Sequence, residues 1–455
     1  MNTVINTRVS QNRGMPRIWL EGKKIAHSFE PGDHYSLEQD VANKRITLRS
    51  DPKGQYKVSV RNRNNRSWPL IELRGENVSR VFEVAMSLRI VVRNGLVTIE
   101  IHGSKRNTTQ RVSDFLKKLL TKESLEIGSV FTGLGVLDRA IHQGLADCGI
   151  ESYTKFVVER ESKYVEACLY NQSDLFRKNS TIVHSSIEDV EFTGEMTLDV
   201  LLGSLPCTGA SIAGKTKKKL QAAEFDADCG AAFYFWLNFV QRFKPLLVVM
   251  ENVTAYMKST SMEVIKSVLN TLGYEVKLTV LNGNEFGTIE NRDRMALIAV
   301  TKELDNFDIN SIVPFKEREN SINELLEPIP EDDKRWKEYS YLADKEIRDK
   351  AAGKGFKRNI VNGSENSLGT IRRLYNKGGS CDQFLMHPAM NGLTRLFTPV
   401  EHARLKGIPE NLVDGVSDTI GHEMLGQSIC FPVFQSVGRA LGKWLLKLNQ
   451  RQSAL

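Results

Sequence analysis

Short apolar runs recur between about residues 125 and 300, and most are separated by stretches with helical periodicity. The runs are GSVFTG, KFVVER, TIVHSS, LDVLLGS, PLLVVMENV, EVKLTVL and MALIAV, and the helical stretches include SKYVEACLYNQ and MEVIKSVLNTLG. Alternation of buried strands with helices is typical of a doubly wound α/β sheet. Such a sheet binds ligands beyond the carboxyl ends of its strands, so the residues that end these runs are the candidates for chemistry.

The segments on either side of this pattern differ from it. Residues 1–111 contain short, partly alternating runs such as RITLRS and LVTIEIHG, which predict a mostly β domain with one helix near SRVFEVAMSLRI. Residues 301–394 are polar and irregular, and helical patterns return at 395–448. We therefore expect a β domain at 1–111, an α/β core at 125–300, an insertion at 301–394 and a C-terminal segment at 395–448 that completes the core.

Positive charge is unevenly distributed along the chain. The formal net charge is +7, yet residues 1–111 hold 20 Lys and Arg against 10 Asp and Glu. Within the insertion, residues 301–349 hold 8 basic and 14 acidic side chains, whereas residues 350–395 hold 8 and 2. Clustered positive charge favours a nucleic-acid partner, and a basic surface that only maintains solubility is an equally good explanation for any one cluster.

Composition excludes several classes of protein. The chain has 455 residues, of which 41% are hydrophobic and 26% are charged, which is a globular balance. It has no uncharged apolar stretch of about 18 residues, and its first residues lack the apolar region of a secretory signal. The six cysteines are scattered without a C-x-x-C pair. We expect a cytoplasmic protein with no membrane span, no disulfide framework and no metal site.

The first and second apolar runs end in a pattern suited to a nucleoside. The first leads into 131–135, FTGLG, where two glycines at a strand-to-helix turn let the backbone approach a ligand closely. The second ends at Glu159, where a carboxylate can accept hydrogen bonds from both ribose hydroxyls. A purely structural turn remains an equal alternative, and the spacing does not say which nucleoside is bound.

The fourth run leads into Pro206 and Cys207, followed by a loop of small residues and a basic stretch, 215–219. A cysteine at this position is exposed at the end of its strand, and backbone N–H groups can stabilise its thiolate as a nucleophile. The small residues would let the loop move as a lid. Taken singly, a cysteine is more often a small core residue.

The fifth run ends in Glu251, and Arg292 and Arg294 precede the last run. A carboxyl group at the edge of an apolar strand is partly desolvated, so its pKa should rise and it can donate a proton to a ring nitrogen. Two arginines two residues apart form a fork suited to ring oxygens or phosphates. A local ion pair for the carboxylate and surface salt bridges for the arginines are the alternatives.

Together these segments resemble the DNA cytosine-5 methyltransferases over about residues 128–442. Residues 131–135 are similar to the family's cofactor loop, 203–214 to its Pro-Cys catalytic loop, 251–253 to its Glu-Asn-Val motif, 290–294 to its Gln-x-Arg-x-Arg motif, 395–409 to the segment closing its target-recognition region, and 426–429 to its final Gly-Asn-Ser-Val motif. Six motifs in the family's order form a specific match.

The resemblance implies a Rossmann-like methyltransferase core with a target-recognition region at 301–394. The implied activity is transfer of a methyl group from S-adenosyl-L-methionine to carbon 5 of cytosine in double-stranded DNA. Cys207 would attack carbon 6 of a flipped-out cytosine, and protonated Glu251 would donate a hydrogen bond to ring N3. Arg294 would contact the ring oxygen O2, and Arg292 would brace the catalytic loop or a phosphate.

The resemblance also implies binding residues. The implied cofactor-binding residues lie at the strand ends and in the last motif: Phe131, Thr132, Gly133, Leu134, Gly135, Glu159, Arg160, Ser186, Ile187, Pro206, Gln427 and Ser428. The implied DNA contacts are in the catalytic loop and the insertion: Ser211, Lys215, Lys357, Arg358, Arg372 and Arg373. A restriction-modification system, with a cognate endonuclease that need not touch this chain, and a bacterial, phage or plasmid origin fit the same family.

This sequence departs from the family pattern at several positions. Val136 stands where the family has glycine, and Ser186 stands where it has an aspartate that contacts adenine. Thr208 replaces a glutamine and Gln427 replaces an asparagine. Glu290 replaces the first glutamine of its motif. Since the proposed catalytic residues remain, we expect an active enzyme with altered cofactor or target details. Methylation of RNA by the same chemistry, and an inactive DNA-binding regulator with this fold, are the alternatives. The insertion and the basic domain at 1–111, which we expect to assist DNA binding, favour DNA.

Overall fold

The computed structural model describes residues 2–63, 65–192, 196–206, 224, 226, 229–304 and 306–453. The chain divides into two compact units, residues 1–114 and 115–455. The division falls inside helix α2 (Gly103–Thr121). Within the described ranges, no helix is both long and apolar enough to cross a bilayer.

The N-terminal unit consists of two antiparallel sheets that share one core. The larger sheet has the order β1-β9-β10-β5-β4-β6 and the smaller has the order β2-β3-β8-β7. Their strands are β1 (Thr3–Arg8), β2 (Ser10–Asn12), β3 (Met15–Glu21), β4 (His34–Asp40), β5 (Arg45–Ser50), β6 (Tyr56–Lys57), β7 (Ser59–Arg63), β8 (Arg66–Arg74), β9 (Ser87–Arg93) and β10 (Leu96–Ile101). Alternate residues of the longer strands point inward, as period-2 patterns require, and the residues between them stay half-buried or exposed.

The helix predicted near residues 79–90 is wrong. A short helix, α1 (Glu76–Ser79), ends where that segment begins, and the last residues of the segment belong to β9. Leu88, Ile90 and Val92 are all completely buried, which is the alternating burial of a strand. This alternation decides the structure of the segment over the helical spacing of the apolar residues before it.

The C-terminal unit is built on a seven-stranded sheet of order β13-β12-β11-β14-β15-β17-β16. Its strands are β11 (Leu125–Val130), β12 (Ser152–Glu159), β13 (Phe176–His184), β14 (Val200–Ser204), β15 (Leu247–Asn252), β16 (Tyr274–Asn282) and β17 (Asp293–Thr301). The first five pair in parallel, and β17 is antiparallel to both β15 and β16. This order confirms the doubly wound core, and it places the carboxyl ends of β11, β12, β14 and β15 at one edge.

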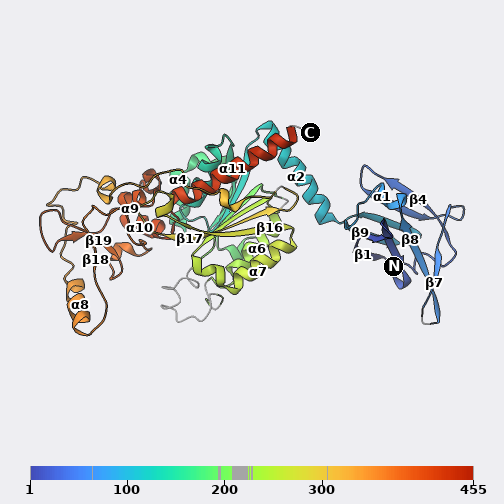
Figure 1. Ribbon diagram of the computed structural model, residues 1–455, viewed down its shortest axis with the longest axis horizontal. Coiled ribbons are helices and arrows are strands. Elements are labelled where there is room, and N and C mark those ends of the chain that lie inside the picture. The colour runs from blue at the N-terminus through green and yellow to red at the C-terminus, as the bar shows by residue number, and fades with distance from the viewer. Residues whose placement is uncertain are drawn as a thin grey trace. The chain divides into compact units, whose positions relative to one another are not determined.

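Helices cover both faces of this sheet. They are α3 (Val136–Ala146), α4 (Ser162–Asn171), α6 (Ala232–Phe243), α7 (Thr260–Thr271) and α11 (Phe431–Ser453). Figure 1 shows α4 and α11 on one side of the strands and α6 and α7 on the other. A cluster of buried side chains, among them Trp236 and Phe239 of α6 and Ile265 of α7, packs α6 and α7 against the strands.

The insertion forms a smaller lobe that leads back to the core. It contains α8 (Ser340–Ala351) and a three-stranded sheet of β18 (Asn359–Val361), β19 (Gln383–Met386) and β20 (Thr394–Arg395). Two helices follow, α9 (Pro399–Leu405) and α10 (Asp418–Gln427). A buried cluster that includes Ile289, Ile371 and Leu405 joins the insertion and α9 to the residues before β17, so the lobe is anchored beside the strand ends.

Candidate active site

The turn after β11 has the backbone that its glycines predict. Phe131, Gly133 and Gly135 have φ values of 60°, 58° and 77°, and α3 begins directly after Gly135. A Cβ atom at Gly135 would lie 2.6 Å from Nε2 of Gln172, so close packing as well as the left-handed φ requires glycine there. The turn therefore brings backbone N–H groups and the start of a helix to the edge of the sheet.

Glu159, the last residue of β12, is fixed by the backbone around it. Its Oε2 accepts a hydrogen bond from the N–H of Gly133 at 2.8 Å. Its Oε1 accepts from the N–H groups of Arg160 and Glu161 at 2.8 and 2.9 Å. These three bonds hold the carboxylate in one orientation beside the turn after β11, where the nucleoside hypothesis needs an acceptor.

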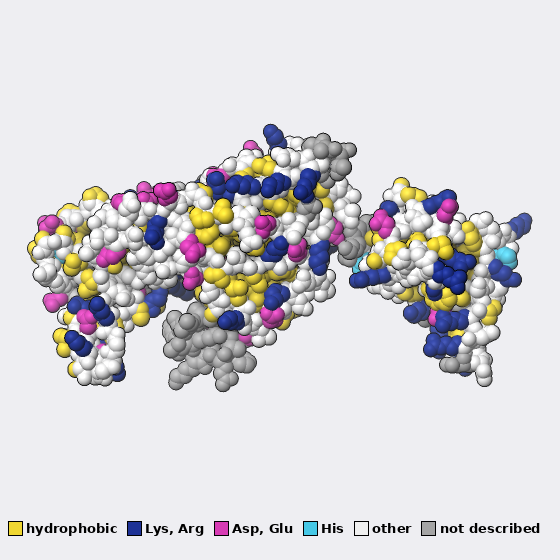
Figure 2. All heavy atoms as spheres, viewed as in Figure 1, with side chains coloured by type: hydrophobic (Ala, Val, Ile, Leu, Met, Phe, Trp, Pro, Cys, Tyr) yellow, Lys and Arg dark blue, Asp and Glu magenta, His cyan; other side chains and the backbone are white. Residues whose placement is uncertain are grey.

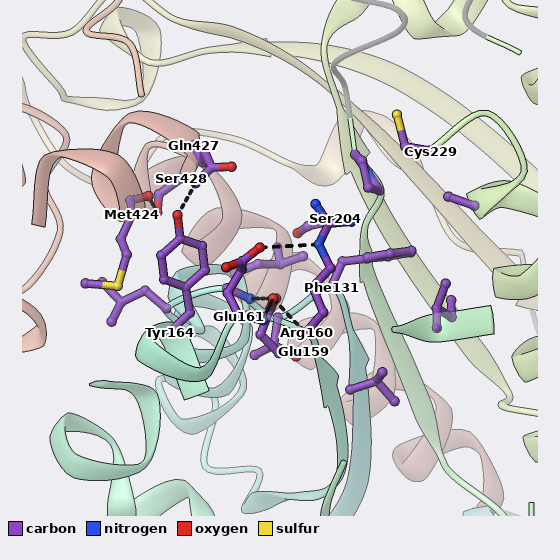
Figure 3. A pocket seen from close by; sticks show the side chains of 18 of the residues that line it. Phe131, Glu159, Arg160, Glu161, Tyr164, Ser204, Cys229, Met424, Gln427 and Ser428 are labelled. Atoms are coloured by element: carbon purple, nitrogen blue, oxygen red, sulfur yellow. Dashed lines mark hydrogen bonds and ion pairs between the residues drawn. The ribbon is translucent and has the colours of Figure 1, made fainter. Parts of the chain in front are cut away.

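A cavity of about 570 Å³ opens at these strand ends (Figure 3). Gly135 and Ser186, which were predicted to bind the cofactor, do not line it, although their neighbours Val136 and Ser185 do. The other predicted cofactor-binding residues all line it: Phe131, Thr132, Gly133, Leu134, Glu159, Arg160, Ile187, Pro206, Gln427 and Ser428. The fold thus brings residues from distant parts of the sequence together around one space.

Sequence reasoning missed several residues that line this cavity. They come from elements whose approach depends on the tertiary fold: Glu161, Tyr164, Glu188, Phe235, Arg373 and Met424. Arg373 borders the cavity and lies 3.9 Å from Glu423, and its predicted DNA contact stays a prediction. Tyr164, in the first turn of α4, carries no local signal that could have identified it.

One hydrogen bond joins the two sides of the cavity. Nε2 of Gln427, at the end of α10, donates to the hydroxyl of Tyr164 at 2.9 Å and to the carbonyl of Glu423 at 3.1 Å. Burial raises the pKa of the Tyr164 hydroxyl, which therefore stays protonated. Gln427 stands where the resembled family has asparagine. Its longer side chain reaches from the last motif to Tyr164 of α4.

The charges around the cavity suit a ligand that carries positive charge. The carboxylates of Glu159, Glu161 and Glu188 line it. The arginines described in its lining are each near an acid, since Nε of Arg160 lies 3.4 Å from Glu161 and Arg373 faces Glu423. A sulfonium nucleoside fits this set better than a nucleoside phosphate does, because phosphates call for uncompensated cations. The volume is also in the range of small-molecule sites.

Glu251 lies at the end of β15 and is buried. Burial raises the pKa of its carboxyl group, while the nearby guanidinium of Arg294 opposes the rise. Nε of Arg294 is 3.6 Å from Oε2 of Glu251. A carboxyl group with a raised pKa beside a guanidinium can donate to a ring nitrogen while the arginine faces a neighbouring ring oxygen.

Asn252 connects the ends of two neighbouring strands. Its Nδ2 donates a hydrogen bond to the carbonyl of Leu205 at 3.0 Å, and its Oδ1 accepts from the N–H of Val253 at 2.8 Å. Leu205 follows β14 and precedes Pro206. The described segment that precedes Cys207 is thus held against the strand that carries Glu251. The predicted nucleophile, Cys207, lies outside the described residues. The predicted DNA contacts Ser211 and Lys215 also lie outside them.

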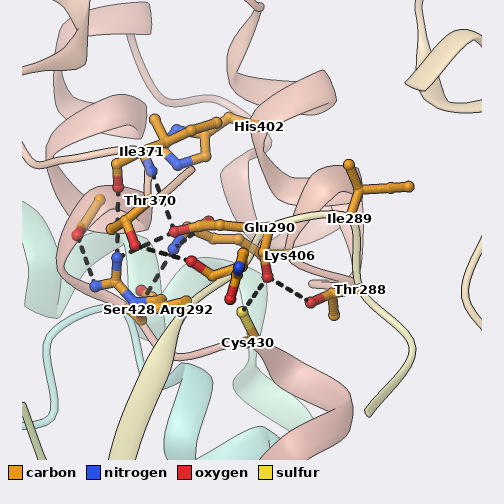
Figure 4. Close-up of polar contacts among 12 residues, drawn as sticks. Thr288, Ile289, Glu290, Arg292, Thr370, Ile371, His402, Lys406, Ser428 and Cys430 are labelled. Atoms are coloured by element: carbon orange, nitrogen blue, oxygen red, sulfur yellow. Dashed lines mark hydrogen bonds and ion pairs between the residues drawn. The ribbon is translucent and has the colours of Figure 1, made fainter. Parts of the chain in front are cut away.

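Arg292 occupies a buried charge cluster (Figure 4). Its Nη1 lies 3.1 Å from Oε1 of Glu290, and its Nη2 donates to the carbonyl of Gly426 at 3.0 Å. Nζ of Lys406 lies 2.8 Å from Oε2 of Glu290. Burial, aided by the charge of Arg292, lowers the pKa of Lys406 to about 8. Within the described residues, these contacts direct Arg292 to the backbone of α10 rather than to a phosphate.

The other predicted DNA contacts lie in the insertion. Lys357 is exposed, and Nε of Arg358 lies 2.8 Å from Glu346 of α8. Nη2 of Arg372 lies 2.9 Å from Asp382. Arg358 and Arg372 are therefore paired with acids of the same lobe.

The fold of the C-terminal unit is that of a known class of methyltransferases. A crystal structure of the S. pombe Dnmt2 methyltransferase aligns with a TM-score of 0.55 and 20% identity, over 71% of this chain and 99% of that chain. This likeness confirms a Rossmann-like methyltransferase fold.

Residues 125–443 match the family described as C-5 cytosine-specific DNA methylase. The chain belongs to this family of enzymes, which confirms the resemblance found in the sequence. It is 28% identical over 268 residues to the type II methyltransferase M1.ScrFI of Lactococcus lactis subsp. cremoris, a match covering 57% of this chain and 66% of that protein, just under two thirds. It is 28% identical over 263 residues to the type II methyltransferase M.NlaX of Neisseria lactamica, covering 56% of this chain and 79% of that protein.

Proposed function

We propose that this protein transfers a methyl group from S-adenosyl-L-methionine to carbon 5 of cytosine in double-stranded DNA. The observation that carries the proposal is the arrangement of side chains at the strand ends. Buried Glu251 of β15 lies beside Arg294 of β17, and Asn252 is hydrogen-bonded to Leu205, which precedes Cys207 by two residues. Family membership supplies the reaction class, and the type II relatives favour a role in restriction-modification.

The chain's own residues would hold the cofactor in the cavity. Glu159 would accept hydrogen bonds from the ribose hydroxyls, and the turn at 131–135 would lie against the amino-acid end. Glu188 lines the cavity and Ser186 does not, so Glu188 would take the role of the family's adenine-binding aspartate. When bound, the cofactor supplies an electrophilic methyl group on a sulfonium.

The base would be activated by three side chains. The Cys207 thiolate would form a bond to carbon 6, which makes carbon 5 nucleophilic. Protonated Glu251 would donate a hydrogen bond to N3 and stabilise the negative charge that develops there, while Arg294 would contact O2. After carbon 5 has gained the methyl group, a base removes its proton, and the electron pair left behind expels the Cys207 thiolate.

A cytosine inside a stacked duplex cannot reach these groups, so the base must be flipped out of the helix. Ser211 and Lys215 of the catalytic loop, with Lys357, Arg358 and Arg372 of the insertion, would contact the DNA around the vacated position. Side chains of the insertion would read the neighbouring base edges.

Tritiated methyl transfer tests the proposal directly. Wild-type protein should label duplex DNA and not tRNA, the Cys207→Ser variant should label neither, and Glu251→Gln should be slower by about 100-fold. Preferential labelling of tRNA would establish the RNA alternative. Equally little labelling by wild type and Cys207→Ser would contradict the proposed activity and leave the inactive regulator as the alternative. Bisulfite-type sequencing of host DNA after expression would then identify the target base and its sequence.

A further inference from the structure

The N-terminal unit carries a strand pair that extends beyond its sheet. β3 pairs with β8 only from Leu70 to Arg74, whereas β7 pairs with β8 from Arg66 to Leu70. Residues 59–63 and 66–69 therefore form a two-stranded ribbon with no third described strand paired to its outer half. Figure 1 shows β7 projecting from the rest of the unit.

The outer half of this ribbon is open to solvent on both faces. Asn62, Arg63, Arg66 and Ser67 are exposed, and 52% of Val60 is exposed. A two-stranded ribbon without a covered face gains little from burial and is marginally stable alone. An ordered ribbon of this kind therefore needs contacts that brace its base. An exposed ribbon that the fold keeps ordered favours a binding role for its tip.

The base of the ribbon is braced. Arg61 forms an ion pair with Glu21 of β3, and its guanidinium lies 5.5 Å from the ring centre of Trp19. Nearer the tip, the hydroxyl of Ser67 donates to Oδ1 of Asn62 across the ribbon at 2.8 Å. These contacts brace the ribbon both at its base and nearer its tip.

The tip concentrates positive charge. Arg63 and Arg66 are directly opposite each other in the β7–β8 register. Like charges at such a position are unfavourable. The sequence has no Asp or Glu between Asp51 and Glu72, and neither arginine forms an ion pair with a described residue. Figure 2 shows Lys and Arg side chains gathered on the visible face of this unit, where Asp and Glu are sparse.

We propose that this ribbon is a second DNA-contacting element, which enters the major groove of duplex DNA with Arg63 and Arg66 facing the phosphates on either side. Neighbouring strands lie about 4.8 Å apart, so a ribbon with its side chains fits a groove about 12 Å wide. A phosphate beside each arginine offsets the repulsion between them. The inference rests on the proposed function only in taking duplex DNA as the partner, and it does not depend on methyl transfer.

The test compares two double variants of the full-length protein by fluorescence anisotropy on a labelled duplex of mixed sequence, across a series of salt concentrations. R63Q/R66Q should weaken binding about tenfold and reduce the slope of log affinity against log salt by about 1.8, which is two phosphate contacts. The control R49Q/R93Q removes the same charge from exposed positions on the larger sheet and should change both quantities little.

Competition with groove ligands tests the groove. Saturating the duplex with methyl green, a major-groove ligand, should abolish the difference between wild type and R63Q/R66Q, whereas netropsin in the minor groove should preserve it. An unchanged salt slope for R63Q/R66Q, an equal loss in the control, or a difference that survives methyl green would overturn the proposal. Methyl transfer at saturating DNA should be unchanged in R63Q/R66Q, so a failure of the proposed function would appear separately, as an inactive wild type.

Discussion

The side-chain amide of Asn252 donates a hydrogen bond to the carbonyl oxygen of Leu205, 3.0 Å away, and so joins the end of β15 to the segment that precedes Cys207, the predicted nucleophile. The same asparagine fixes the N–H of Val253. We expect Asn252→Ala to lower kcat for methyl transfer about tenfold or more, because the loop loses its anchor. The dissociation constant of the cofactor, measured by calorimetric titration, should change little.

Asn171→Ala is the matched control for this prediction. Asn171 also donates to a backbone carbonyl, that of Leu412 at 2.9 Å, but this bond joins α4 to the segment before α10 and lies outside the approach to Cys207. Equal losses of kcat in both variants would show that the bond of Asn252 is only structural.

The buried pair of Glu290 and Lys406 predicts a large effect on stability. Glu290→Gln leaves the buried cations of Arg292 and Lys406 without their shared counter-charge and should lower the free energy of unfolding by about 3 kcal/mol. The double variant E290Q/K406Q also removes the charge of Lys406, leaves Arg292 as the one unpaired cation of these three side chains, and should recover part of that loss. Urea denaturation measures both, and Lys266→Met, which breaks an exposed pair with Glu263, should have little effect.

Asp138 predicts a dependence of stability on pH. It is buried in the first turn of α3, where its Oδ2 accepts a hydrogen bond from Ser129 at 3.0 Å, and burial raises its pKa to about 7 from 3.8. Between these values the folded state binds more protons than the unfolded state. The stability that this group contributes is therefore present at low pH and is lost as pH rises to about 7.

Asp138→Asn should remove this trend. Urea denaturation at pH 5 and pH 8 should show wild type losing about 3 kcal/mol more than the variant does. Asp147→Asn is the control, because the pKa of Asp147 is lowered by its partners and its titration lies below this range. Identical pH trends in wild type and Asp138→Asn would contradict the prediction.

Gly135 tests the packing of the turn. Gly135→Ala should lower the free energy of unfolding by about 2 kcal/mol or more and weaken cofactor binding, since its Cβ would meet both Gln172 and Cys168. Gly149→Ala is the control, because Gly149 has a similar φ of 74° but nothing within 4 Å of its Cβ. Calorimetric titration and urea denaturation separate the two effects, and equal destabilisation in both variants would point to backbone strain alone.

The strand ends of the core could be predicted because apolar runs bounded by turn residues specify buried parallel strands. The runs ending before Phe131, at Glu159 and at Glu251 became β11, β12 and β15. In the N-terminal unit the same reasoning failed at residues 79–90, where helical spacing concealed the alternation that forms β9.

Residues that depend on distant contacts could not be predicted. The burial of Arg292 follows from Gly426 and Lys406, which are more than 100 residues away in the chain. Tyr164 and Glu188 reach the cavity only because α4 and the segment after β13 fold over its rim. The periodicity of apolar residues and the spacing of motifs carry no information about which distant segments come into contact.

The contacts that anchor the insertion to the buried charge cluster come from its backbone. The N–H of Ile371 donates to Glu290 at 3.2 Å, and its carbonyl accepts from Arg292 at 3.5 Å. Neither bond depends on which side chain occupies position 371, beyond its need to fill an apolar space. Much of the lobe can therefore diverge in sequence while its attachment to Glu290 and Arg292 stays the same. Under the proposed function, such divergence would change the preference among DNA sites without disturbing that attachment.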